Sequence, residues 1–209
     1  MDNDFPKLYL KTPKNPDYNT FPKQLSVVLD SFEIACLRIE FNTRNDLKKE
    51  RLAEILRKIC NERDVSILIN HHIEMSLKLG LDGVHLFGGC EDIRKARQKL
   101  GKNSIIGVYC GSSKHSGLVA GEAGADYISF GPLKNDDQES GKLANLSLFQ
   151  WWNKIIELPV VAEGGVNLEN FLKIHKFSDF VALDAEIWDT EDPKTTIEHF
   201  YNLTSKTSS

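Results

Sequence analysis

Most of the side chains that could do chemistry stand where short apolar runs of this sequence end. Arg38 and Glu40 lie two residues apart at the end of one run, and Asn42 continues that spacing. Side chains two apart on an extended strand point to the same side of it. Three polar side chains would be costly to bury against a helix layer, so we expect them at the rim of a binding pocket.

Histidines follow or interrupt the next two runs. Asn70, His71 and His72 close one of them, and His85 lies inside the other, ahead of a cysteine and two acids. Histidine, cysteine and carboxylate groups on neighbouring loops are ligands for transition metals. Adjacent histidines project in different directions, however, and the sequence has no HxxxH or CxxC pair, so the spacing specifies no zinc site. We expect His85 to be a core histidine because it lies within an apolar run.

A glycine pair and two acids end the last two runs. Gly164 and Gly165 follow Glu163, and Asp184 closes the final run. A glycine pair that opens a helix exposes backbone N–H groups, which can hold a phosphate. Glu163 and Asp184 would present negative charge to a phosphate there. Elsewhere, His115 ends the string Ser-Ser-Lys-His, and histidine can donate or accept a proton near neutral pH.

Eight apolar runs rich in β-branched and aromatic residues predict strands that would position these side chains. The runs are residues 8–11, 35–41, 66–70, 83–87, 105–110, 127–132, 159–165 and 180–184. Apolar residues with helical spacing predict helices between them, for example over 45–60 and 146–156.

Alternation of strands and helices predicts parallel strands, because a parallel pair needs a crossover of about a dozen residues. An open doubly wound sheet and a closed barrel both fit this pattern. The eight strands and the absence of a GxGxxG or GxxxxGK loop favour closure. We therefore predict an α/β fold, a single compact (βα)8 TIM barrel over residues 1–203, with a polar tail at 204–209 that frays. Its active site would be built from the loops after the strands.

Composition excludes several classes of partner. The 209 residues are 41% apolar and 27% charged, with a formal net charge of −4, so no positive field exists to hold nucleic acid or an anionic membrane. No apolar run reaches the roughly 18 to 20 residues that cross a bilayer, and residues 1–10 do not form a signal peptide. We expect a cytoplasmic protein with reduced cysteines and a small-molecule ligand at the barrel mouth. The sequence leaves a homo-oligomer open.

Several strings resemble a known family. GVHL at 83–86, IIGVYC at 105–110, GEAGADYISFGP at 121–132 and PVVAEGGV at 159–166 resemble thiamine-phosphate synthase and its thiazole tautomerase (TenI-like) relatives. The resemblance extends from LYLKTP at 8–13 to AEIW at 185–188. It implies a (βα)8 barrel and a transferase of thiamine biosynthesis. Such an enzyme couples an aminopyrimidine diphosphate with a thiazole phosphate, releases pyrophosphate and uses Mg²⁺ as its cofactor.

The resemblance also implies roles for the residues after strands two and three. The family's glutamine, arginine and lysine after strand two appear here as Arg38, Glu40 and Asn42, so an acid replaces one cation. Of the family's Asn-Asp-Arg after strand three, Asn70 carries over. His71 and the histidine after it replace the metal-binding acid and the arginine.

The remaining family positions diverge further. Among the positions that bind the metal in the family, only Asp92 is still a carboxylate here. The family's threonine-rich loop with its lysine is replaced by the stretch 134–142, which we expect to be mobile. The glycine pair matches the family's phosphate cradle, but Glu163 and Asp184 take the places of an aliphatic residue and a serine. In the tautomerase relatives a histidine after strand five acts as acid or base, and His115 matches it.

Three functions stay open from these observations. The first is a synthase that works with substituted residues. The second is a barrel that has lost the reaction and binds another ligand or a partner at its mouth. The third is a different reaction on an uncharged or cationic substrate, with acids as general bases. The substitutions favour the last two, which the sequence does not rank. The expected ligand-binding residues are Arg38, Asn70, Gly164 and Gly165, the expected metal ligand is Asp92, and the expected pocket residues are Glu40, His71, His72, Glu163 and Asp184.

Overall fold

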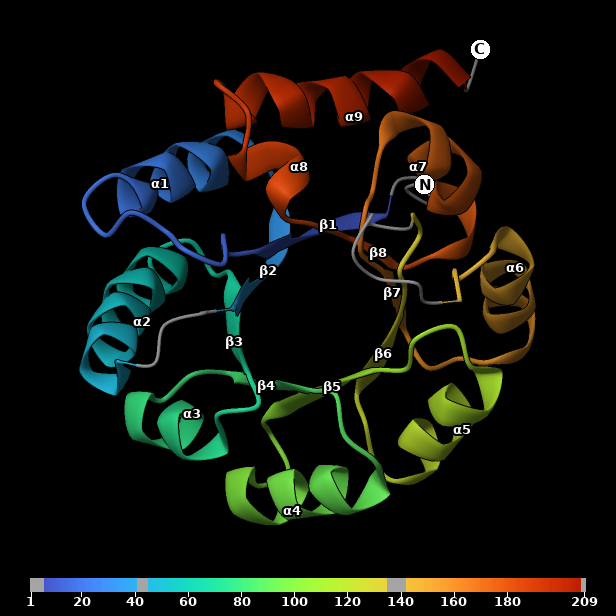
Figure 1. Cartoon of the computed structure of the whole chain (residues 1–209), viewed down its shortest axis with the longest axis horizontal. Coiled ribbons are helices and arrows are strands. Elements are labelled where there is room, and N and C mark those ends of the chain that lie inside the picture. The colour runs from blue at the N-terminus through green and yellow to red at the C-terminus, as the bar shows by residue number, and fades with distance from the viewer. Residues whose placement is uncertain (1–5, 41–44, 135–141, 208–209) are drawn as a thin grey trace.

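Eight parallel strands close into a barrel in the computed structural model of this chain, which describes residues 6–40, 45–134 and 142–207. Each strand pairs with the next one in the sequence, and the last pairs with the first (Figure 1). The strands are β1 Lys7–Lys11, β2 Ile34–Ile39, β3 Ser66–Asn70, β4 Gly83–Leu86, β5 Ile105–Tyr109, β6 Tyr127–Phe130, β7 Val160–Ala162 and β8 Phe180–Leu183. The predicted (βα)8 barrel is confirmed.

Helices surround the ring of strands (Figure 1). They are α1 Phe21–Ser31, α2 Asp46–Asn61, α3 Ile73–Leu79, α4 Cys90–Leu100, α5 Lys114–Glu122, α6 Leu146–Ile155, α7 Leu168–Ile174, the 3₁₀ helix η1 His175–Phe177, α8 Ala185–Trp188 and α9 Pro193–Thr207. Helices α2 and α6, which were predicted over residues 45–60 and 146–156, each begin after an asparagine. Asn45 accepts a hydrogen bond from the backbone N–H of Lys48, and Asn145 accepts one from that of Leu148. These side chains satisfy N–H groups that the first helical turn leaves free.

Some predictions concern residues at or beyond the limits of the described ranges. Helix α9 runs to Thr207, past the predicted end of the barrel at residue 203. Residues 135–141 of the stretch expected to be mobile lie outside the described residues, as do Asn42 and residues 208–209. Among the helices of the described residues, none is both long and apolar enough to cross a bilayer.

The two faces of each strand serve different layers. Residues of one face pack against the helices in the large apolar cluster, as Leu8 and Leu10 of β1 do. Residues of the other face point into the barrel lumen, where a separate apolar cluster lies towards the amino-terminal ends of the strands. It consists of Tyr9, Cys36, Leu68, Tyr127, Val161 and Ala182. Further along the same strands the lumen side chains become polar, and these build the site.

Strand β7 ends at Ala162, three residues earlier than predicted. Gly164 and Gly165 have φ angles of 85° and 71°, a left-handed conformation that favours glycine and cannot continue a strand. Since parallel strands all end on the same side of the barrel, this turn places Glu163 beside the carboxyl ends of the other strands. The side chains predicted from strand ends are therefore brought together at one mouth.

Candidate ligand site at the barrel mouth

A buried ion pair crosses the lumen near the mouth. The Arg38 side chain, from β2, is 0% exposed, and its Nη1 lies 3.4 Å from Oε1 of Glu163. Its Nη2 contacts the second oxygen of Glu163 and lies 2.7 Å from Oε1 of Glu40. A buried guanidinium without partners would cost several kcal/mol in lost hydration. Both terminal nitrogens of Arg38 are therefore committed to acids of the protein itself.

Lys11 joins these residues from the end of β1. Its Nζ lies 3.4 Å from Glu40, 3.7 Å from Glu163 and 3.3 Å from Asp184. We call Lys11, Arg38, Glu40, Glu163 and Asp184 the mouth cluster. With two cations and three carboxylates, it holds one negative charge in excess when all are ionised. Lys11 was not predicted as a site residue, although it ends the first predicted strand.

The charges of the mouth cluster set its protonation. Burial alone would raise the pKa of Glu163, but the positive charges of Arg38 and Lys11 outweigh it and hold that pKa well below its usual range. Burial would lower the pKa of Lys11, yet the neighbouring acids, Glu163 first, raise it above its ordinary value. For Asp184 burial prevails over Lys11, so its pKa is raised. Asp184 therefore takes up a proton more readily than an ordinary aspartate.

Hydrogen bonds extend from Glu163 down the lumen. The Ser129 hydroxyl donates to Oε1 of Glu163, and His85 Nε2 lies 3.7 Å from the same oxygen. On the other side of its ring, His85 Nδ1 lies 2.8 Å from the hydroxyl of Tyr127, which lies 2.8 Å from that of Tyr9. His85 is 0% exposed, so the structure confirms it as a core histidine.

A cavity of about 1040 Å³ opens at the mouth cluster, a size that suits a small molecule. Its lining includes Lys11, Lys14, Lys134, Glu40, Glu163, Asp184, Glu186, Asp189, Phe87, Tyr109, Gly164 and Gly165. The Phe87 side chain is 47% exposed, and its ring centroid lies 5.3 Å from that of Tyr109 and 4.8 Å from that of His71. The cavity thus offers carboxylates together with an open aromatic surface.

Glu186, which was not predicted as a site residue, accepts hydrogen bonds from two backbone N–H groups that follow β7 and β8. The N–H of Val166 donates to its Oε1 at 2.9 Å, and the N–H of Asp184 donates to its Oε2 at 2.8 Å. These donors follow the glycine pair Gly164–Gly165 and the end of β8, where a phosphate was expected. A carboxylate accepts hydrogen bonds as a phosphate does. The protein therefore satisfies these two donors with an acid of its own.

Asn70, His71 and His72 line a smaller recess of about 330 Å³ together with Glu40. Oδ1 of Asn70 is buried and has no hydrogen-bond partner in the described part of the chain. His71 has a φ of 57°, uncommon for a residue with a side chain, and burial lowers its pKa. His72 is exposed, with Nε2 at 3.4 Å from Nζ of Lys49. The predicted residues after strand three thus lie at the rim and adjoin the mouth cluster through Glu40.

The donor set does not fit Mg²⁺. Asp92 is exposed in the first turn of α4, and its carboxylate folds back to where a Cβ on Gly88 would lie. The second acid that the resemblance requires is replaced by His71, a nitrogen donor, whereas Mg²⁺ takes oxygen ligands. Within residues 6–40, 45–134 and 142–207, no group of three or more His, Cys, Asp or Glu side chains could hold a metal ion. Asp92 is therefore the one carboxylate left at the family's metal positions, and Mg²⁺ there would need further oxygen ligands, such as those of substrate phosphates.

His115 lies apart from the mouth cluster. It is exposed in the first turn of α5 and is not one of the residues that line the mouth cavity. The neighbouring Lys114 places its Nζ 4.3 Å from the ring centroid of Trp151. A role for His115 in proton transfer stays a prediction.

Acid is expected to destabilise this barrel from about pH 6.5 downward because of His85. Burial lowers the pKa of His85 well below its ordinary value of 6.5. Below that value the unfolded chain takes up a proton that the folded chain does not. The free energy of unfolding should therefore fall by up to about 1.4 kcal/mol per pH unit. Glu163, whose pKa is lowered in the fold, adds a second loss as the pH falls below its ordinary value of 4.5.

Urea unfolding at several pH values measures this slope. The His85→Gln variant cannot titrate at this position, so its stability should vary less between about pH 6.5 and pH 5. The matched variant His115→Gln changes an exposed histidine and should keep the slope of the unmodified chain. An unchanged slope in His85→Gln would assign the acid sensitivity to another group.

Comparison with known proteins assigns the family. A family model described as "Thiamine monophosphate synthase" matches residues 8–186. A thiamine-phosphate synthase of Rhodospirillum centenum is 35% identical over 186 residues, which cover 87% of this chain and 89% of that protein. One of Erythrobacter litoralis is 33% identical over 200 residues, covering 93% of each. Among solved structures, the thiamine phosphate pyrophosphorylase from Pyrococcus furiosus superposes with a TM-score of 0.81 at 23% identity, over 98% of this chain and 97% of that one. With the resemblance in its motifs confirmed in this way, the chain belongs to the thiamine monophosphate synthase family.

Proposed function

We propose that the mouth of this barrel binds a small molecule without a phosphate group, and that the chain does not carry out the diphosphate displacement of the family's synthases. The observation that carries this proposal is the Glu186 carboxylate, which accepts hydrogen bonds from the backbone N–H groups of Val166 and Asp184. A phosphate could use these donors only by displacing Glu186. It would also meet the Asp184 carboxylate, a repulsion of about 1 to 4 kcal/mol at this kind of distance.

The two cations of the mouth cluster support the same proposal. A departing diphosphate needs positive charge on its oxygens. Arg38 is fully buried and paired with Glu163 and Glu40. Lys11 is shared among three carboxylates at 3.3 to 3.7 Å. Their charge is already neutralised within the protein, so little of it is left for a ligand.

The cavity lining favours an uncharged or cationic planar ligand. Five carboxylates and three lysines line it. Phe87, which is 47% exposed, also lines the cavity beside Tyr109. An organic cation gains from the face of an aromatic ring by about 0.5 to 2 kcal/mol, and it would be attracted to the acids as well. The raised pKa of Asp184 would further allow it to exchange a proton with such a ligand.

Thiamine and thiamine phosphate form a matched pair of probes, because they share a cationic ring system and differ in the phosphate. Thiamine at about 100 times its dissociation constant should stabilise the fold by about 2.7 kcal/mol. For a chain of this size that raises the melting temperature by roughly 5 to 10 °C. Thiamine phosphate and Mg²⁺ pyrophosphate should produce little or no shift in the same thermal-unfolding measurement.

Four variants locate the binding in this experiment. Asp184→Asn and Phe87→Ala should each reduce the shift with thiamine, and the exposed His115→Gln should leave it unchanged. Glu186→Ala frees the backbone N–H groups of Val166 and Asp184, so it should introduce a shift with thiamine phosphate. A shift with thiamine phosphate or with Mg²⁺ pyrophosphate, but none with thiamine, in the unmodified chain would contradict the proposal.

A further inference from the structure

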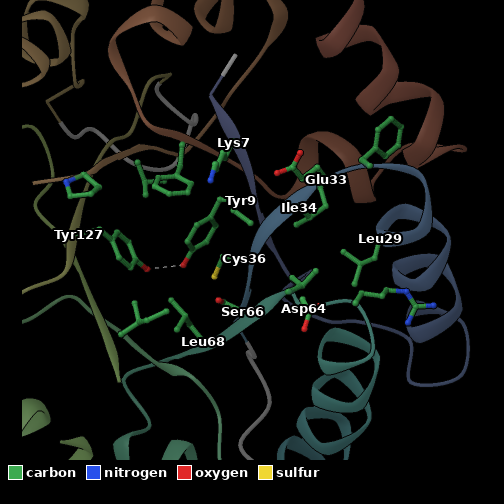
Figure 2. A pocket seen from close by; sticks show the side chains of 18 of the residues that line it. Lys7, Tyr9, Leu29, Glu33, Ile34, Cys36, Asp64, Ser66, Leu68 and Tyr127 are labelled. Atoms are coloured by element: carbon green, nitrogen blue, oxygen red, sulfur yellow. Dashed lines mark hydrogen bonds between the residues drawn. The ribbon is translucent and has the colours of Figure 1, made fainter. Parts of the chain in front are cut away.

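A second cavity, of about 720 Å³, lies at the amino-terminal end of the barrel, opposite the mouth. Figure 2 shows it from close by, with Tyr9 and Tyr127 reaching towards each other across the lumen and Cys36, Ser66 and Leu68 beside them. We call it the lower cavity. It shares no lining residue with the mouth cavity, so a ligand here would occupy a separate site.

The lower cavity exists because the lumen layer above it mixes very large and small residues. Barrel interiors are ordinarily filled by layers of bulky side chains. Here β2, β7 and β8 contribute Cys36, Val161 and Ala182 to the layer that contains the two tyrosines. The ring of Tyr127 fits across the lumen because it occupies the place that a Cβ on Gly107 would take. The small residues leave space that a further large side chain would otherwise fill.

The charges of the lower cavity lie at its rim. Lys7, Glu33 and Asp64 are exposed to solvent there. Two other charged side chains of the lining are engaged elsewhere, Arg63 with Asp30 and Asp126 with Arg97. The inner wall is formed by buried residues such as Leu68 and Val161, without a charged side chain among them. A charged ligand group would lose its hydration inside without gaining a partner, so the interior selects an uncharged ligand.

The same wall offers aromatic surface and hydroxyl groups. Tyr9, Tyr127 and Phe180 line the cavity, and the two tyrosine hydroxyls are 2.8 Å apart. Aromatic rings pack edge-to-face against one another. A tyrosine hydroxyl both donates and accepts hydrogen bonds, so a hydroxyl group of a ligand is a suitable partner for it. We infer that the lower cavity is a binding site for an uncharged aromatic ring of phenol size that carries a hydroxyl group.

Titration of the full chain with phenol, followed by NMR of the ¹⁵N-labelled protein, tests this inference. Phenol should bind saturably and move the amide signals of Asp64 and Ser66, leaving those of Gly164 and Gly165 in place. Benzoate and benzylamine, which carry a negative or a positive group on the ring in place of the hydroxyl, should each bind at least about tenfold more weakly. Signals that move mainly at Gly164 and Gly165, or no saturable binding, would overturn the inference.

Matched serine variants give a second measurement. Ser66→Phe adds a ring to the lining of the lower cavity and should weaken phenol binding at least about tenfold. Ser116→Phe makes the same change on the exposed surface of α5 and should leave binding unaltered. Equal phenol affinity in a folded Ser66→Phe variant and the unmodified chain would place phenol outside the lower cavity and overturn the inference. Because the lower cavity is separate from the mouth, this result does not depend on whether thiamine binds there.

Discussion

A coupled assay for thiamine phosphate formation, with the purified chain, both phosphorylated substrates and Mg²⁺, is expected to show turnover at least about four powers of ten below that of an active synthase. Loss of one group that stabilises developing charge costs roughly 3 to 4 kcal/mol in enzymes that have been tested by substitution. Two independent losses should therefore reduce the turnover rate by about four powers of ten. By the family resemblance this chain has two, because His71 stands where the family has a metal-binding acid and Glu186 accepts hydrogen bonds from backbone N–H groups beside the expected phosphate cradle.

Combined substitutions separate binding from turnover in that assay. Glu186→Ala with Asp184→Ser removes two carboxylates beside the expected phosphate cradle. This double variant should gain affinity for thiazole phosphate while its turnover stays low, because the metal ligands are still missing. Turnover at an ordinary enzymatic rate in the unmodified chain would refute the proposed loss of the synthase reaction. It would also show that the mouth cluster rearranges when substrates bind.

Arg38→Met is expected to lower the free energy of unfolding by about 3 to 5 kcal/mol, because removal of one partner leaves a buried charge unpaired. Glu163 is 4% exposed and loses its main cation in this variant. The double variant Arg38→Met with Glu163→Leu removes the buried charge as well, and it should recover much of the lost stability. Urea unfolding at neutral pH measures all three chains.

A surface arginine provides the control for this prediction. Arg63 makes an ion pair with Asp30, whose side chain is 60% exposed. Exposed pairs contribute about 0 to 1 kcal/mol, so Arg63→Met should change stability far less than Arg38→Met. Equal losses in the two variants would show that removal of the arginine stem, and not the buried charge, determines the effect.

The architecture and four of the five residues of the mouth cluster could be predicted from sequence, because both depend on where strands end. Arg38, Glu40, Glu163 and Asp184 were found this way, since parallel strands place their carboxyl ends together. Lys11 could have been found by the same rule, as it is the last residue of the first run.

Other features of the site could not be predicted from the local sequence. Glu186 lies in the short helix α8, and its role arises from backbone groups on two loops that come together only in the fold. The pairing of Arg38 with Glu163 joins residues 125 positions apart. His115 matches its motif in sequence, but α5 begins outside the mouth cavity and leaves it exposed. Spacing along a chain predicts which face a residue occupies, while contacts between distant loops depend on the complete barrel.

The two-faced strands also have a consequence for how such barrels change over generations. In β1, Leu8 and Leu10 hold the helices in place, whereas Tyr9 and Lys11 face the lumen. A lineage can therefore change a lumen residue without altering the contacts that the intervening residues make with the helices, but a buried charge such as Arg38 has to change together with its partner. Because function depends on the site residues and the barrel depends on the scaffold residues, the barrel can persist while the residues of the lumen change.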